Sequence, residues 1–560
     1  MKGNSRGARF DVTADGRGVT GRAGTGLLAE VADTIGLTAA LEDAVNGCRS
    51  WTDHAPGKVV RDLVLVLADG GDTLRHLKTL DGDDQRVLFG AVASPATANR
   101  TVVALAEDEL VVERLATTRK AARAQAWARG GAPPVVAAAR AGERPAAPLC
   151  VDIDATLVTA HSDDKDGAAV TYKKGWGFHP LIAYLDRGDG LGESLAGMLR
   201  PGNAGSNNAA DHIDVFEAAI DQLGDLPDGV AVVVRADAAG CTHDFLTYLR
   251  AAGVGFSVGH ALSGAVRTAI RALHDDAWTP ALTQDGAVRD GAAAAEITDQ
   301  LDLTQWPSGA RVIVRREPLH PGAQQTLDDI DGCRFTAFLT DQTDADIAVL
   351  EQRHRAHARV EDRIRGAKDS GLRNLPCDTF ERNAVWLQLI LAGQDLMAFT
   401  QALTLDGELR RAEPAGLRYK LLHAPARLVR SGRRWTLRIQ PTGPGPRAAH
   451  RLHPPAQPAA PGHLSAALLR PSSDKPQPTM RADTAAASIC SQTTTNSTLH
   501  PPPLPKSAAP PPPPSPGVSQ APQPRRSGVR RNIEAKGPLA RSGLENETSG
   551  GPRLGRYDER

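Results

Sequence analysis

The sequence predicts a mixed α/β protein in which a helical region precedes a central sheet and a proline-rich tail follows it. Apolar residues recur at helical spacing near the N-terminus and again after about residue 345. β-like segments alternate with one clear helix from residue 149 onward, and most of the 40 prolines lie from residue 441 to the end. The 41% share of apolar residues fits a globular protein, and 560 residues allow roughly two to four domains.

Residues 24–130 are predicted to be helical. Apolar residues of GLLAEVADTIGLTAALEDAV fall near helical spacing, VVRDLVLVLADGGDTLRHLKTL repeats the pattern across a Gly-Gly break, and Ser94 is a candidate helix cap. Such helices form either a bundle ahead of the main domain or a helix-turn-helix reader of DNA, and periodicity does not separate the two. Residues 1–23 are expected to be disordered.

A linker rich in Ala, Pro and Arg (131–148) leads into an α/β block. The segments VDIDATLVTA, GFHPLIAYLD, SLAGMLRPG and AVVVRADAAG are predicted strands, and AADHIDVFEAAIDQL (209–223) is a predicted helix. A strand, two partners, a helix and a further strand are the opening of a mixed α/β sheet.

The predicted secondary structure changes twice in the second half of the chain. Residues 250–345 are predicted to be β-rich, with strands in GARVIVRREP and CRFTAFL, and helices return between 346 and 400. From 351 to 440 the chain carries 17 Lys and Arg against 10 Asp and Glu, so 401–440 is read as the end of a basic region. Residues 441–560 cannot bury a core and are expected to be a disordered proline-rich tail.

Composition excludes several classes of protein. The formal net charge is zero, so the chain as a whole has no bias toward nucleic acid, and its six cysteines form no CxxC pair. That argues against a zinc ribbon or a disulfide framework. The N-terminus does not resemble a signal peptide and no apolar run is long enough to span a membrane, so we expect a cytoplasmic protein.

Four acidic residues stand out by context. Asp152 and Asp154 share one face of a predicted strand, where each uncompensated carboxylate costs several kcal/mol. Asp237 ends a second strand and Glu361 lies in an Arg-rich helix. Because ligands bind at the carboxyl edge of such sheets and hard divalent cations prefer oxygen ligands, these acids form a candidate metal site. Helix caps, turns and solvated strand ends are the alternative explanation of such acids.

Five motifs in order resemble bacterial DDE transposases of cut-and-paste insertion sequences. They are VDIDATLV, KKGWGFHPL, LRPGNAGSNNAADHI, VVVRADAAG and VEDRIRGAKDSGLRNLP. The nearest match is the branch with a DxDAT first motif and an RPGNAxSN middle motif, and the resemblance covers roughly 20–440. It implies a ribonuclease H-like catalytic core over 149–249 and 346–400, interrupted by the β-rich insertion 250–345.

The resemblance also implies roles for individual residues. The first acid of the family precedes a Thr by two positions, which places it at Asp154, with Asp152 as the fallback ligand; the others fall on Asp237 and Glu361. In the related Tyr-Arg-Glu-Lys signature, Lys368 occupies the Lys position. His354 and His357 replace its Tyr and Arg. The resemblance further implies that metal ions, rather than a buried Arg or Lys, neutralise the first strand.

Further residues are candidate contacts to DNA. They are Lys368, Arg359, Arg363 and Arg365 on the basic helix, Asn203 and Asn207 in the RPGNAGSNN segment, and Trp306 in the insertion. A Gly/Asn turn explains the two asparagines (and Ser206) equally well, and packing explains Trp306. His179 is expected to be a satisfied core or edge histidine, and His161 is a weaker candidate for approaching the metal.

The expected function is transposition of an insertion sequence. Helices 24–130 and the basic C-terminal segment would bind terminal inverted repeats, and two Mg²⁺ ions (or Mn²⁺) would support phosphodiester cleavage and strand transfer in a homodimeric synaptic complex near the nucleoid. The alternatives are a metal-dependent nuclease without strand transfer and a catalytically inactive DNA-binding remnant.

Overall fold

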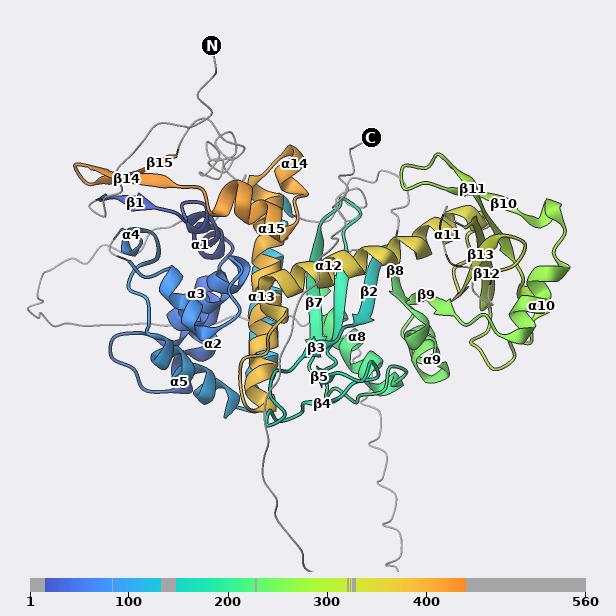
Figure 1. Ribbon diagram of the computed structural model, residues 1–560, viewed down its shortest axis with the longest axis horizontal. Helices are drawn as coiled ribbons and strands as arrows, with labels where there is room; N and C mark the ends of the chain where they lie inside the picture. The colour runs from blue at the N-terminus through green and yellow to red at the C-terminus, as the bar shows by residue number, and fades with distance from the viewer. Residues whose placement is uncertain are drawn as a thin grey trace, which may run out of the picture. The chain divides into compact units, whose positions relative to one another are not determined.

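The structure is a computed structural model that describes residues 16–82, 84–131, 148–226, 229–319, 322, 324 and 329–439 (Figure 1). Almost all of the predicted linker 131–148 and the whole tail 441–560 lie outside the described residues. None of the described helices combines the length and apolar character needed to cross a membrane.

The secondary structure follows the predicted alternation of helical and β-rich regions. The α-helices are α1 Thr25–Thr34, α2 Leu37–Val45, α3 Pro56–Ala68, α4 Arg86–Phe89, α5 Pro95–Ala106, α6 Val111–Ala126, α8 Ala209–Leu223, α9 His243–Ala251, α10 Gly264–Ala272, α11 Ile347–Arg355, α12 Arg359–Ala367, α13 Phe380–Thr404, α14 Gly407–Arg410 and α15 Pro414–Leu417. The strands are β1 Val19–Thr20, β2 Leu149–Ala155, β3 Val158–Thr159, β4 Ala169–Val170, β5 Trp176–Phe178, β6 Leu181–Asp186, β7 Gly192–Met198, β8 Val232–Ala236, β9 Gly255–His260, β10 Thr279–Leu282, β11 Val288–Glu296, β12 Arg311–Pro318, β13 Cys333–Thr340, β14 Ala426–Ser431 and β15 Arg434–Ile439.

Nine strands of the described chain form one mixed sheet, in the order β10-β11-β12-β13-β9-β8-β2-β6-β7. β2 runs parallel to β8, which runs parallel to β9, and the other neighbours are antiparallel. The mixed α/β class predicted from the sequence is therefore confirmed. The β-rich segment 250–345 extends this sheet, because its first strand, β9, pairs with β8 and the other strands of the segment follow from β13 on the far side of β9.

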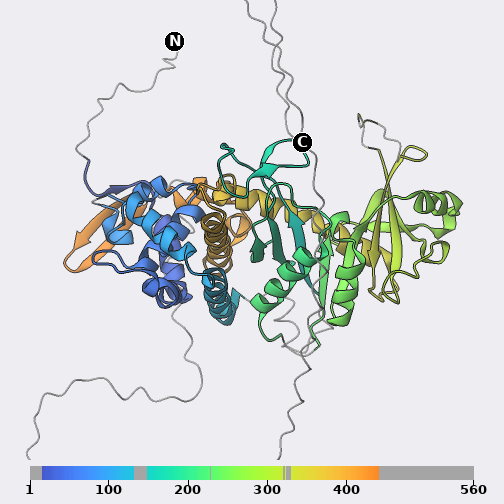
Figure 2. The ribbon, with the colours of Figure 1, turned by 90° about the horizontal axis from the view of Figure 1, so that it is seen from below.

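The two faces of β2 lead into different surroundings. Leu149, Val151 and Ile153 are buried in an apolar core with α8 and α9. Successive side chains of a strand alternate between its faces, so the intervening acids point the other way, toward the side that α12 covers. Figure 2 shows α12 across one face of the central strands and α8 and α9 on the other.

Helix α13 joins the N-terminal helices to the sheet. It packs against α1, α3, α5 and α6 on one side and against β7 on the other (Figure 1). Its buried residues run along nearly its whole circumference, and one apolar core includes residues of α1–α6, α12 and α13. The predicted cap Ser94 is confirmed, since its hydroxyl accepts a hydrogen bond from the Thr97 amide at the start of α5.

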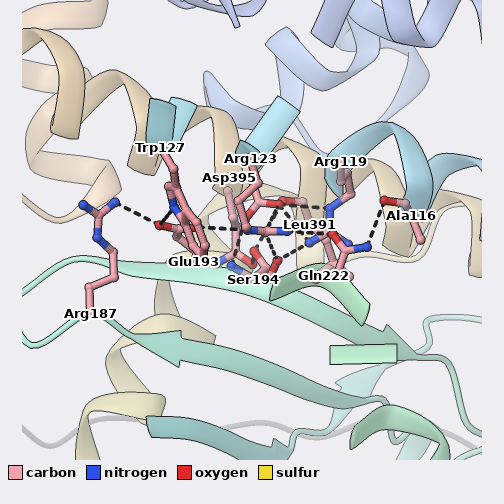
Figure 3. A network of polar contacts seen from close by, with 11 residues as sticks. Ala116, Arg119, Arg123, Trp127, Arg187, Glu193, Ser194, Gln222, Leu391 and Asp395 are labelled. Carbon is pink, nitrogen blue, oxygen red and sulfur yellow. Dashed lines mark hydrogen bonds and ion pairs between the residues drawn. The ribbon is translucent and has the colours of Figure 1, made fainter. Parts of the chain in front are cut away.

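A buried ion network strengthens this junction, and we call its five charged residues Arg119, Arg123, Arg187, Glu193 and Asp395 the helix–sheet network (Figure 3). Arg123 of α6 donates to Glu193 at 2.9 Å and to Asp395 of α13 at 2.8 Å. Arg119 also donates to Asp395, and Arg187 to Glu193. All five side chains are at most 4% exposed. The network therefore ties α6, α13 and β7 together.

The chain around β1 differs from expectation. Residues 1–23 were expected to be disordered, but Val19 and Thr20 pair antiparallel with Arg427 and Ala426 of β14, which forms a hairpin with β15. A two-residue edge strand has no periodicity of its own, and its partner lies in the distant 401–440 segment. The sequence pattern therefore carries no signal for it.

Candidate active site

Asp154 and Asp237 lie side by side at one edge of the sheet. β2 and β8 are parallel, their last paired residues are Ile153 and Ala236, and each acid follows its strand's last pair. This is the juxtaposition that the carboxyl-edge rule predicts. Both acids line one pocket of about 490 Å³, whose other walls include the β4–β5 turn and the loop from Gly202 to Ser206.

Among the described residues, no Lys, Arg or His side chain forms an ion pair with the Asp154 carboxylate. Its pKa is raised to about 6, mainly by burial and also by the charges of Asp237 and Glu361, against the opposing effects of His357 and the Ala155 amide. Its Oδ1 accepts a hydrogen bond from the adjacent Ala155 amide, at 2.7 Å. Asp154 therefore lies where a cation would relieve both desolvation and repulsion.

Glu361 approaches from another element. It lies exposed in the first turn of α12, a helix that packs against β2 and β6. An all-carboxylate donor set fits a hard divalent cation such as Mg²⁺ or Mn²⁺. Within the described ranges, no three His, Cys, Asp or Glu side chains are close enough to hold a metal ion as a group. The three carboxylates would have to draw together to bind one ion jointly.

Asp152 has a different environment, which corrects one expectation. Both of its oxygens accept hydrogen bonds at 2.7 Å from Arg235 of β8, and His357 lies 2.8 Å from its Oδ1. Asp152 is 2% exposed and Arg235 is 1% exposed. We expected metal ions rather than a buried Arg to neutralise this strand, and for Asp152 that was wrong, because its register partner in parallel β8 is an arginine.

The Asp152–Arg235 pair belongs to a larger cluster, which we call the catalytic-edge network: Asp152, Asp186, Arg235, His357 and Arg359. Arg235 also donates to Asp186 of β6 at 2.8 Å, and Arg359 of α12 donates to the same carboxylate at 2.9 Å.

This network touches every element that carries a candidate acid. Asp152 is two residues before Asp154, Arg235 is two before Asp237, and Arg359 is two before Glu361. The network therefore fixes the relative positions of β2, β8 and α12 from just behind the pocket.

The four candidate basic residues differ in whether another group of the protein already binds them. Arg363 donates to the Gly190 carbonyl at 3.2 Å, Arg365 pairs with Asp362 and Glu413, and Arg359 is held by Asp186. Lys368 has no ion-pair partner within the described part of the chain. Its pKa is lowered by burial and by the neighbouring charges of Lys173 and Arg373, whereas Asp154 raises it. Of the four, Lys368 is thus the cation that no ion pair or hydrogen bond engages among the described residues.

The RPGNAGSNN segment forms part of the pocket wall. Asn203 and Ser206 line the pocket, while Asn207 is exposed and accepts a hydrogen bond from Ser206. A Cβ on Gly202 would come within 2.2 Å of the Gly177 carbonyl oxygen and 2.4 Å of that of Ala169. Only glycine lets this loop pack against the hairpin β4–β5.

The aromatic and histidine candidates also have definite positions. Trp306 is half-buried and stacks on His243, with ring centroids 4.1 Å apart. His179 is 4% exposed, bonds the Ala204 carbonyl and lines the pocket, as expected of a satisfied histidine. His161 is exposed and is not among the residues that line the pocket.

Two features of the site escaped sequence reasoning. Arg235 and Asp186 were not singled out, although the RAD tripeptide places Arg235 on the same strand face as Asp237. The alternation was therefore an available signal. Tyr172 on the pocket rim was also missed, because a short hairpin leaves no periodic pattern.

Comparisons with known proteins give the family. No curated protein matches the chain. The family model described as "Transposase DDE domain group 1" matches residues 3–453, which is most of the chain and all of its described part. That family implies a transposase enzyme whose substrate is DNA, and the chain belongs to the DDE transposase family.

Proposed function

We propose that the chain is the transposase of a cut-and-paste insertion sequence, of the branch with DxDAT and RPGNAxSN motifs, with Asp154, Asp237 and Glu361 as its catalytic carboxylates. The observation that carries this assignment is the pairing of Asp154 with Asp237 in one pocket, beside the charge of Glu361. Asp152 is the weaker candidate ligand, since both of its oxygens are engaged by Arg235.

The topology supports a ribonuclease H-like core. The run β7-β6-β2-β8-β9 has antiparallel strands on one side of β2 and parallel strands on the other. The first acid ends the central strand, the second ends its parallel neighbour, and the third lies on a helix that crosses the same face. The strands β10–β13 enter between the second and third acids, where an insertion is expected.

The chemistry follows from the residues at this edge. Two Mg²⁺ ions (or Mn²⁺) held by the carboxylates would lower the pKa of the attacking water or 3′-hydroxyl and offset charge on the leaving oxygen. Asp154 and Asp237 would bind from the sheet and Glu361 from α12. Lys368 would bind a phosphate of the scissile strand, and Asn203 would orient the strand at the pocket wall. Hydrolysis and strand transfer are both in-line displacements at phosphorus, so one site serves both.

DNA and a second protomer complete the proposed assembly. The N-terminal helices and the basic 401–440 segment would hold the terminal inverted repeats in a homodimeric synaptic complex at the nucleoid. Arg359, Arg363 and Arg365 are bound within the protein, so contacts from them to DNA would require exchange of those partners.

Cleavage of labelled DNA that spans the end of the insertion sequence tests the catalytic assignment. We expect Mg²⁺-dependent cleavage by the wild type and none by Asp237→Asn. Asp221→Asn, an exposed acid in α8 paired with Lys120, is the matched control and should cleave normally. Equal cleavage by wild type and Asp237→Asn would contradict the assignment.

A supercoiled target plasmid separates transposition from simple cleavage. Joined products between the element end and the plasmid are expected from the wild type. Nicking without joined products would identify a nuclease instead, and DNA binding without either product would identify an inactive remnant.

A further inference from the structure

A second pocket, of about 230 Å³, borders α12 away from the candidate acids, and we call it the α12 pocket. Its walls come from the β6–β7 hairpin, α12, α13 and the segment 411–414 between α14 and α15 (Figure 1). Arg363 lines this pocket, and Glu361 lies about 200° around the helix from it. The α12 pocket is therefore distinct from the one that Asp154 and Asp237 line.

Two guanidinium groups border the α12 pocket without a carboxylate partner among the described residues. Arg363 is half-buried and donates to the Gly190 carbonyl at 3.2 Å. Arg411 is exposed, and its side chain has no hydrogen bond or ion pair within the described ranges. Burial lowers the pKa of Arg363 against the attraction of Asp186 and Asp152, so its charge is incompletely compensated. An anion beside the two guanidinium groups would offset that cost.

The carboxylates of the same pocket are already paired. Asp362 and Glu413 line it, and both bind Arg365, at 2.8 and 3.3 Å. Three arginines thus stand against two carboxylates around this pocket. The balance of charge favours an anionic ligand over a cationic one.

Buried hydroxyl groups add hydrogen-bond donors. Ser194 is 1% exposed and Tyr184 is 2% exposed, and both line the pocket. The Ser194 hydroxyl lies 3.3 Å from the Leu391 carbonyl and from Gln394 Oε1, and the Tyr184 hydroxyl lies 3.4 Å from Gln394 Oε1. Because O–H···O bonds are usually roughly 2.5–3.0 Å long, each hydroxyl would gain by donating to a closer, charged oxygen.

We propose that the α12 pocket binds phosphate, free or as a small ester, beside Arg363 and Arg411, and that this ligand holds α12 in the position seen here. Guanidinium forks match the oxygens of a phosphate group, and the two hydroxyls supply further donors. A pocket of this volume admits a free phosphate or a small ester. A stretch of DNA backbone would have to bring its neighbouring nucleotides in as well.

The position of α12 matters because this helix carries Glu361. The three candidate carboxylates would have to draw together to bind one ion jointly, and a shift of α12 toward the sheet edge would bring Glu361 to Asp154 and Asp237. A ligand that contacts α12, α13 and the β6–β7 hairpin as they lie here favours this arrangement over the closed one. Phosphate should therefore oppose Mg²⁺-dependent cleavage. This second part rests on the proposed function, whereas phosphate binding does not.

Thermal unfolding of the full chain, without metal, tests the site. Inorganic phosphate and adenosine monophosphate are the probes, and chloride at equal ionic strength is the reference. Both probes should raise the Tm of wild type, and the concentration dependence gives their affinity. Arg363→Gln and Arg411→Gln should each weaken that affinity roughly 10- to 150-fold, the loss of a hydrogen bond to a charged group. Arg271→Gln, at an exposed arginine of α10, is the matched control and should bind as wild type.

The outcomes of this experiment do not depend on catalysis. If wild type binds neither probe, or if Arg411→Gln binds phosphate as tightly as wild type, the site is overturned whatever Asp237→Asn shows in cleavage. If both glutamine variants lose affinity for a DNA duplex but not for phosphate, the arginines contact DNA and the inference is also overturned. Because Arg411 is exposed, its variant should fold, and far-ultraviolet circular dichroism checks this.

Cleavage with and without phosphate, at constant free Mg²⁺, tests the hold on α12. Phosphate should slow cleavage by wild type and should slow Arg411→Gln less, each compared with its own rate in chloride. Equal slowing of both would mean that phosphate competes at the acids themselves, and the hold on α12 would be overturned. If wild type does not cleave even in chloride, the proposed function fails and the binding result stands.

Discussion

The two buried ion networks of this protein have similar ingredients and different neighbours. In the helix–sheet network, Arg119, Arg123 and Arg187 surround Glu193 and Asp395. In the catalytic-edge network, Arg235 and Arg359 face Asp152 and Asp186. Every carboxylate within both networks has an arginine partner.

The two networks differ in the acid that lies next to them: Asp154 follows Asp152 of the catalytic-edge network by two positions on β2. Asp154 is on the same strand face as Asp152, and it borders an open pocket and forms no ion pair within the described part of the chain. In the helix–sheet network burial also raises the pKa of Glu193, but that carboxylate accepts hydrogen bonds from Arg123 and Arg187. Buried charge alone thus does not mark the active site; an uncompensated carboxylate beside compensated ones does.

The largest expected effect comes from breaking the helix–sheet network. Arg123→Met removes the shared partner of Glu193 and Asp395 and should lower the free energy of unfolding by about 3–5 kcal/mol. Urea unfolding measures it. Lys120→Met on the same helix removes only an exposed pair with Asp221 and should cost about 0–1 kcal/mol. Similar losses from both variants would contradict the importance assigned to burial.

The next largest effect concerns the two acids of β2, which we compare through the pH dependence of the free energy of unfolding of the metal-free protein. The pKa of Asp154 is raised to about 6 from 3.8, so its ionised form destabilises the fold by about 3 kcal/mol above pH 6. This penalty should disappear as pH falls from 6 toward 4, where the folded protein takes up the proton first. Asp154→Asn should abolish that part of the pH dependence.

Asp152 should show the opposite sign. Burial opposes its ionisation, but Arg235 and His357 outweigh burial and lower its pKa. Its ionised form therefore contributes stability above pH 3.8, which is lost as pH falls further. Asp152→Asn should be less stable than wild type at neutral pH, whereas Asp154→Asn should be more stable. The same direction of change for both would break the distinction between the two acids.

A smaller effect is expected at His357, which links the catalytic-edge network to the pocket. His357→Ala removes a hydrogen bond to the charged Asp152 and should cost about 1.5–3 kcal/mol. It should also raise the pKa of Asp154, because His357 lowers it in the native protein. The pH dependence of unfolding reports both changes, and exposed His161→Ala is the control. If the pKa of Asp154 is the same in His357→Ala as in wild type, His357 does not act on the pocket carboxylate.

Local sequence patterns predicted which acids lie close together, but they did not predict the residues that hold those acids in place. Alternation placed Asp152 and Asp154 on one face, and the carboxyl-edge rule brought Asp237 beside them. The partner of Asp152 depends on which strand neighbours β2 and in what register, and Arg235 lies 83 positions away. Likewise, helical periodicity predicted the N-terminal helices but not their packing on α13, because that packing depends on contacts between segments far apart in the sequence.

The pairing of β9 with β13 has a consequence for how the chain is made. β8 covers one edge of β9, and only Ala337–Thr340 of β13 cover the other. While synthesis proceeds from β9 to β13, the nascent sheet carries an unpaired edge with buried-type residues such as Phe256 and Val258. Open edges of this kind pair readily with other chains. A polypeptide cut short between these two strands should therefore self-associate, whereas one that reaches Thr340 can close its own sheet.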